Sequence, residues 1–164
     1  MVRYMLIAAI SAAFTLGAYA EANDVLGDWY TAGKRSKVQI FEKDGKYHGK
    51  IVWLIEPEYP EGDPEAGKPR RDRENPDEDK RNTPIIGLVF MHDFEYEGES
   101  EWSSGRIYDP ESGKTYKSKM TLEDPDTLNV RGYIGIAAFG RTETWTRVPA
   151  DEQKQEDAAP AAAQ

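Results

Sequence analysis

The chain has 164 residues, of which 30 are acidic and 21 are basic, giving a formal net charge of −9. This balance argues against nucleic acids and anionic membranes as partners, because both repel a negatively charged protein. There is no cysteine, so the fold cannot depend on disulfides or on thiolate metal sites.

The first 20 residues are typical of a secretory signal peptide. Arg3 supplies a positive charge, Met5 to Leu16 is an apolar run, and Ala18 to Ala20 is a small-x-small cleavage site. The alternative is a permanent membrane helix, but the run is shorter than the ~20 residues that a span requires. We therefore predict cleavage after Ala20, a periplasmic or secreted destination, and no stable membrane insertion of the mature chain.

After the signal, the sequence predicts a series of short antiparallel strands within a single domain, 21–148. The segment 27–31 is short and aromatic, and the segment 36–43 alternates apolar and polar residues as a half-buried strand does. Asp44-Gly45 is a strong hairpin signal. Beyond it, alternate residues share one face, and we predict that this strand pairs with the preceding one: Tyr47, Gly49, Ile51, Trp53 and Ile55.

The segment 56–84 interrupts the strands. It holds six of the ten prolines, a density that excludes regular secondary structure. A loop of this length is uncommon in a compact domain and tends to be a functional flap or a disordered segment. Turn-forming residues at Asp72, Asn75 and Asp77 favour a partly ordered flap, although simple disorder is the alternative.

Strands resume at the apolar run 85–91, which leads into 93–97, and we predict one strand that bends at Gly87. The segments 127–134 and 140–148 are the last two strands. The tail, 149–164, is polar, rich in alanine and without periodicity, which predicts disorder.

The most sharply defined feature is a hairpin whose arms are 102–108 and 114–122. Asp109 and Pro110 specify a type I turn, and Gly113 provides the positive φ from which the second arm starts. About eight strands result, which is the number expected of an antiparallel up-and-down barrel or a two-sheet sandwich. Trp29 and Trp145, central in the first and last strands, favour closure of the barrel, because pairing these strands removes both exposed edges.

Motifs for catalysis or metal binding are weak. Gly113-Lys-Thr115 lacks the earlier glycine and the following helix of a phosphate-binding loop. His48 and His92 are not at a zinc-ligand spacing from a second histidine or a cysteine. A solvated charge run is a better interpretation than a calcium site for Asp72, Glu74, Asp77 and Asp79, because arginines lie among these carboxylates. We expect no enzyme activity, no metal and no cofactor.

Eight motifs, spread over residues 26–148, together resemble the bacterial family called domain of unknown function 2147. The resemblance implies a small exported protein with a lipocalin-like barrel, in which Gly27-x-Trp29 and Arg147 are similar to the first-strand motif and the late arginine of the calycins. It implies no particular activity. The motifs are Gly27-x-Trp29, Lys37-Val-x-Ile40, Gly49-Lys-Ile-Val-Trp53, Asp72-x-x-Asn75-Pro-Asp77, Ile86-Gly87, Gly105-x-Ile-Tyr-Asp-Pro-x-Ser-Gly-Lys-x-Tyr116, Leu128-x-Val-Arg-Gly-Tyr133 and Arg141-Thr-x-Thr-Trp-Thr-Arg147.

Two hypotheses for function remain. In the first, the barrel holds a small amphipathic or hydrophobic ligand, with its apolar part against Trp29, Tyr47 and Trp53 and an anionic head at Arg131 or Arg141. In the second, side chains fill the barrel, and the protein is an interaction or envelope-stress accessory whose partner the sequence does not name. An eight-stranded barrel has room for either arrangement.

Overall fold

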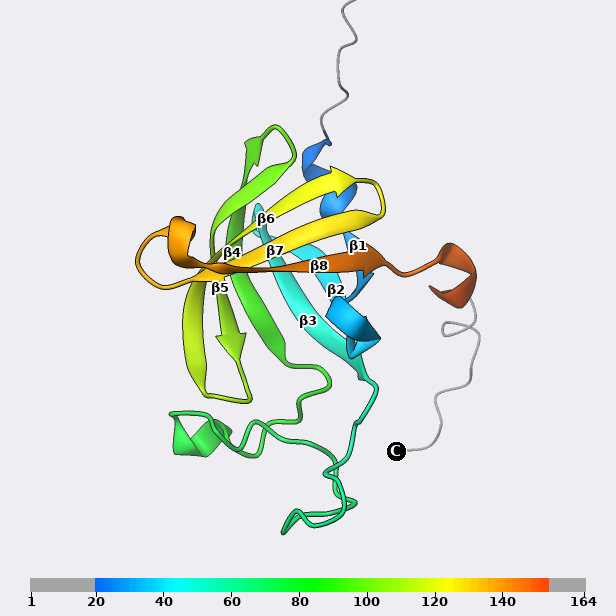
Figure 1. Ribbon diagram of the computed structural model, residues 1–164, viewed down its shortest axis with the longest axis vertical. Coiled ribbons are helices and arrows are strands. Elements are labelled where there is room, and N and C mark those ends of the chain that lie inside the picture. The colour runs from blue at the N-terminus through cyan, green and yellow to red at the C-terminus, as the bar shows by residue number, and fades with distance from the viewer. Residues whose placement is uncertain (1–19, 154–164) are drawn as a thin grey trace, which may run out of the picture.

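Alternating apolar and polar residues produce eight antiparallel strands, each hydrogen-bonded to the next (Figure 1). The computed structural model describes residues 20–153, so the predicted signal, apart from Ala20, lies outside the described residues. β1 also pairs with β8, through Trp29 opposite Arg147, and this pairing closes the barrel. The eight-stranded barrel is thus confirmed over the sandwich. The strands are β1 Gly27–Tyr30, β2 Ser36–Lys43, β3 Lys46–Leu54, β4 Val89–Gly98, β5 Glu101–Asp109, β6 Lys114–Asp124, β7 Thr127–Tyr133 and β8 Arg141–Arg147.

Side chains fill one end of the barrel. The short helix η1, Ala22–Val25, packs against the core there, and the indole Nε1 of Trp29 donates to the carbonyl of Val25 at 2.9 Å. The Arg147 guanidinium lies 4.1 Å from the centre of the Trp29 ring and donates to the carbonyls of Asp24 and Leu26. Trp29 and Arg147 therefore join the first and last strands to the segment that plugs this end.

Two glycines let large side chains cross the middle of the barrel. A Cβ at Gly105 would lie 2.4 Å from the Phe94 ring, and one at Gly49 would lie 2.5 Å from the sulfur of Met91. Phe94 and Met91 are fully buried, so these side chains occupy the space that a larger residue on the facing strand would need.

The long loop, 55–88, is ordered by its own hydrogen bonds and by the β5–β6 hairpin. Asp72 is completely buried: its carboxylate accepts from the hydroxyl of Tyr108 and from the side-chain amide of Asn75, both at 2.6 Å. Burial, followed by the bond to Asp72, raises the pKa of Tyr108 far above its usual range, so its hydroxyl stays protonated and donates. The solvated charge run predicted here is thus wrong for Asp72, because Tyr108 and Asn75 satisfy it inside the protein.

Hydrogen bonds and an ion pair within the long loop also stabilise the parts that lie away from Asp72. The hydroxyl of Tyr59 donates to the carbonyl of Arg71 and accepts from its N–H, both at 3.1 Å. Asp77 accepts from the N–H of Asp79 and pairs with Lys80 at 3.0 Å, which agrees with the turn-forming role predicted for it. These contacts support a folded flap.

Two strand predictions need correction. The strand expected from residue 85 begins at Val89, because Gly87 has a φ of +97° and its N–H bonds to the carbonyl of Ile51 from within the loop. Trp53 does not share the inner face of Ile51. Lys37 pairs with Trp53 while Val38 pairs with Ile51, so an irregularity in β3 turns Trp53 to the other side.

Residues 149–153 belong to the predicted tail but fold back on the barrel. Residues 150–153 form a helical turn, and the carboxylate of Glu152 accepts from the hydroxyl of Tyr30 at 2.6 Å. The Tyr30 ring lies edge-on to Trp53, with centroids 6.4 Å apart. Across residues 20–153, the structure contains no helix with the length and apolar character of a membrane span.

Candidate functional site

The end of the barrel opposite η1 is hollow. A cavity of about 820 Å³ opens between the strand ends, the segment around η2 (Ala32–Lys34), the long loop and the β5–β6 turn. This volume lies within the ~300–1,000 Å³ range of small-molecule sites. The barrel is therefore filled at one end and open at the other.

Apolar side chains from six strands make the inner wall of the cavity. Because successive residues of a strand point to opposite faces, each strand supplies the residue that its alternation directs inward. Ile51, Phe90, Val130 and Trp145 are buried, whereas the others are partly exposed. The apolar members on the strands are Ile51, Leu54, Phe90, Ile107, Tyr116, Val130 and Trp145.

Trp145, which lines the cavity, also carries a polar atom that is buried. Its indole Nε1 is buried and has no hydrogen-bond partner within residues 20–153. A buried donor without an acceptor is destabilising.

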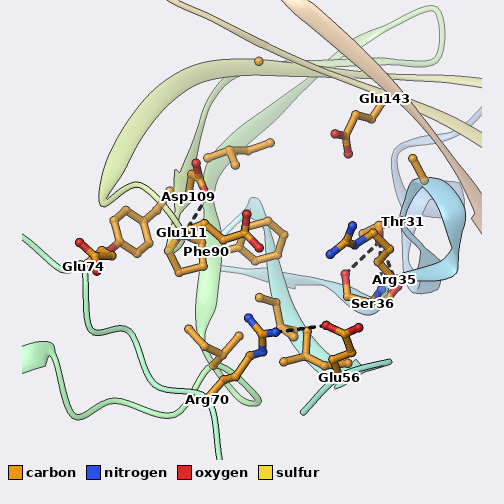
Figure 2. A pocket seen from close by; sticks show the side chains of 18 of the residues that line it. Thr31, Arg35, Ser36, Glu56, Arg70, Glu74, Phe90, Asp109, Glu111 and Glu143 are labelled. Carbon is orange, nitrogen blue, oxygen red and sulfur yellow. Dashed lines mark hydrogen bonds and ion pairs between the residues drawn. The ribbon is translucent and has the colours of Figure 1, made fainter. Parts of the chain in front are cut away.

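Three arginines of the long loop line the mouth and are held by carboxylates. Arg70 pairs with Glu56 at 3.2 Å, as Figure 2 shows, and Arg71 with Glu65. Arg73 pairs with Asp63 at 2.9 Å and lies 4.5 Å from the Tyr59 ring. The pKa of Asp63 is lowered by the N–H of Glu65 and then by Arg73. The charge of these three arginines is already balanced.

Two further arginines of the lining, Arg35 and Arg141, are different. Both are exposed, and neither forms an ion pair with any residue between 20 and 153. Arg35 follows η2 and lies beside Thr31 and Ser36 (Figure 2). Arg141 begins β8, two residues before Glu143 and four before Trp145 on the same inward face. These guanidinium groups can form bidentate bonds to a carboxylate or a phosphate.

Carboxylates are also present at the mouth. Asp109 is occupied by its own turn, since it accepts from the N–H of Glu111 at 3.0 Å and from the hydroxyl of Ser112 at 2.5 Å. Glu143 projects toward the open space above Arg35 in Figure 2 and pairs with no described cation. The mouth thus offers two cations, Arg35 and Arg141, and two carboxylates, Glu111 and Glu143, that form no ion pairs with residues 20–153.

The five residues that the sequence proposed for ligand binding do not come together. Arg141 lines the cavity, whereas Trp29 and Tyr47 are buried beyond the lining, where Tyr47 donates to Asn23 at the plugged end. Trp53 is on the outer wall beside Tyr30. Arg131 points outward and donates to the carbonyl of Ala137 at 2.7 Å.

The sequence reasoning missed Arg35 and Trp145 as lining residues. The sequence pattern assigns Trp145 only to closure of the barrel, although it lies one alternation from Glu143 and two from Arg141. Arg35 carried no periodic signal, because it is in a turn whose direction depends on the β1–β2 pairing. The three loop arginines lay in a stretch that sequence patterns could not place.

A family model described as an uncharacterized protein conserved in bacteria (DUF2147) matches residues 27–147. Among solved structures, the chain is similar to protein HP1028 from the human pathogen Helicobacter pylori, which is described as belonging to the lipocalin family. The two are 24% identical with a TM-score of 0.67, over 84% of this chain and 92% of that chain. At this identity the likeness shows the fold alone. Curated proteins gave no match. The family match spans all eight strands, and the chain therefore belongs to the bacterial DUF2147 family, with a lipocalin-like barrel as its fold.

Proposed function

We propose that this chain is an exported binding protein that holds one small amphipathic ligand in the open end of its barrel. One observation carries the proposal: a largely apolar cavity of about 820 Å³ has at its mouth two arginines that form no ion pair with residues 20–153. An interaction module filled by side chains would not need this space.

The ligand's tail would lie against the wall formed by Ile51, Phe90, Val130 and Trp145. Each methylene group buried there contributes about 0.8 kcal/mol, so a short alkyl chain is enough for useful affinity. An anionic head would meet Arg35 and Arg141, which otherwise face water. A hydrogen bond to a charged group contributes about 1.5–3 kcal/mol.

Titrating the purified protein with dodecanoate, dodecylamine and dodecanol tests the proposal. We expect dodecanoate to bind with 1:1 stoichiometry and to change tryptophan emission, because Trp145 lines the cavity. The double variant Arg35→Gln/Arg141→Gln should bind dodecanoate at least tenfold more weakly and dodecanol with unchanged affinity, because only the charged head loses a partner.

Arg106→Gln is the matched control, since Arg106 is equally cationic but pairs with Asp93 at 2.7 Å and does not line the cavity. It should bind dodecanoate like the wild type. Absence of saturable binding by all three probes would overturn the proposal. Tighter binding of dodecylamine than of dodecanoate would overturn the assignment of the head to Arg35 and Arg141 and point to Glu143.

Export is part of the same proposal. The mass of protein recovered from the periplasm should correspond to a chain that begins at Glu21, because the Ala18 to Ala20 motif precedes it. Recovery of the intact chain from Met1 in the cytoplasmic fraction would contradict the proposed export.

A further inference from the structure

The loop between β7 and β8 exposes a small apolar patch. Ile134, Ile136 and Phe139 have 75%, 62% and 85% of their surface exposed, the highest values among the large apolar residues that the structure describes. Single exposed apolar side chains are ordinary on protein surfaces, but three within six residues are a candidate contact site. None of them lines the cavity.

The loop has a defined shape. Arg131 donates to the carbonyls of Ala137 and Ala138 at 2.7 and 3.2 Å and to the hydroxyl of Thr142 at 2.7 Å. The short helix η4, Ala137–Phe139, lies within it. Arg131, expected from the sequence to bind ligand, therefore holds the loop so that its apolar side chains point away from the barrel. Figure 1 shows the loop, in orange, projecting from the barrel wall.

The surroundings of this loop are basic, although the protein is acidic. Residues 114–122 and 127–142 hold three lysines, two arginines and no acidic residue. β6 pairs with β7, with Lys117 opposite Tyr133 and Lys119 opposite Arg131. Lys119 pairs with Glu101 at 2.6 Å, but Lys117 is exposed and forms no ion pair with residues 20–153. The net charge counts the whole chain, but salt screens interactions between charges more than about 8 Å apart at physiological ionic strength. A surface that contacts this loop therefore interacts mainly with the nearby basic residues.

We propose that the β7–β8 loop docks the protein reversibly on an anionic lipid bilayer. Ile134, Ile136 and Phe139 enter the interfacial region, and Lys117 meets the anionic headgroups beside them. Each basic residue near such a surface contributes about 1 kcal/mol. The apolar contact area of three side chains is much smaller than the ~800 Å² that each partner buries in a standard protein interface. A bilayer is therefore favoured over a protein partner.

Docking would also bring the cavity close to the lipid. Gly132 and Arg141, at the two ends of the loop region, both line the cavity. The binding of the loop to lipid nevertheless does not require an occupied cavity, so it can be tested independently of the proposed ligand.

Co-sedimentation with phosphatidylcholine vesicles, with and without 30% phosphatidylglycerol, tests the inference. We expect the wild type to bind the anionic vesicles, and the double variant Ile134→Ser/Phe139→Ser to partition at least tenfold more weakly. Ile86→Ser is the matched control, because Ile86 is 45% exposed but lies in the long loop. Lys117→Glu should weaken binding severalfold on anionic vesicles only, and 0.5 M salt should do the same.

Circular dichroism should show unchanged melting temperatures for these surface variants. Equal partitioning of the wild type and the double variant would overturn the inference, as would equal binding to neutral and anionic vesicles. Light scattering that shows a wild-type dimer lost in the double variant, without vesicle binding by either protein, would assign the patch to a second copy of this chain instead.

Discussion

Gly113→Val is expected to lower the free energy of unfolding by about 3 kcal/mol or more, because strain and a steric clash coincide at this position. Gly113 has a φ of +68°, a conformation that a β-branched residue rarely adopts. A Cβ there would also lie 2.1 Å from the carbonyl oxygen of Glu74, which belongs to the long loop. The substitution should therefore both strain the hairpin and push the loop away from it.

Gly45→Val separates these two effects. Gly45 has a similar φ of +76° in the turn between β2 and β3, but a Cβ at this position would meet nothing within 4 Å. We expect it to cost about 1–3 kcal/mol from backbone strain alone. Urea denaturation of both variants measures the difference. Equal losses would mean that Glu74 moves away without cost and that the loop is not fixed by the hairpin.

Asp72→Ala is expected to lower the free energy of unfolding by about 3–5 kcal/mol, because it leaves the hydroxyl of Tyr108 and the amide of Asn75 without their buried acceptor. A polar group that loses its partner costs about 1–3 kcal/mol when buried, and both Tyr108 and Asn75 are half-buried. The same change removes the side-chain hydrogen bond between the long loop and β5. The mouth of the cavity should then become more accessible to proteases within residues 55–88.

Asp77→Ala is the matched control. Asp77 lies in the same loop and its pKa is lowered, first by Lys80 and then by the N–H of Asp79, but the residue is solvent-exposed. Its loss should change stability by less than about 1 kcal/mol. A double-mutant cycle with Tyr108→Phe isolates the buried pair. Additive effects of Asp72→Ala and Tyr108→Phe would show that their hydrogen bond does not couple the loop to the barrel.

Sequence patterns located the hairpins well because turns are local. Asp44-Gly45 specifies positive φ at both positions, and the structure has φ values of +55° and +76° there. Asp109 and Gly113 likewise close their turn with a bond of 2.8 Å from the N–H of Gly113 to the carbonyl of Asp109. We predicted closure of the barrel because an open sheet would leave its first and last strands with unpaired edges.

Patterns failed where one residue changes the register or where distant segments meet. The irregularity between Lys37 and Val38 moved Trp53 to the outer wall, and period-2 alternation cannot reveal such a shift. Asp72 looked like part of a charged surface run, since its burial depends on Tyr108, 36 residues away.

The sequence by itself determined the antiparallel strands and their hairpins, because alternation and turn chemistry act between neighbouring residues. It favoured a closed barrel over a two-sheet sandwich, and the pairing of β1 with β8 decides between them. It also supplied the features from which we predict export. Only the tertiary structure decided where the barrel is hollow. Trp29 and Tyr47 have the aromatic side chains that are common in ligand sites. However, they lie at the end of the barrel that η1 and Arg147 fill. At the other end, Arg35 and Arg141 form no ion pair with residues 20–153, whereas Arg70 and Arg73 pair with Glu56 and Asp63, and sequence spacing does not fix that distribution.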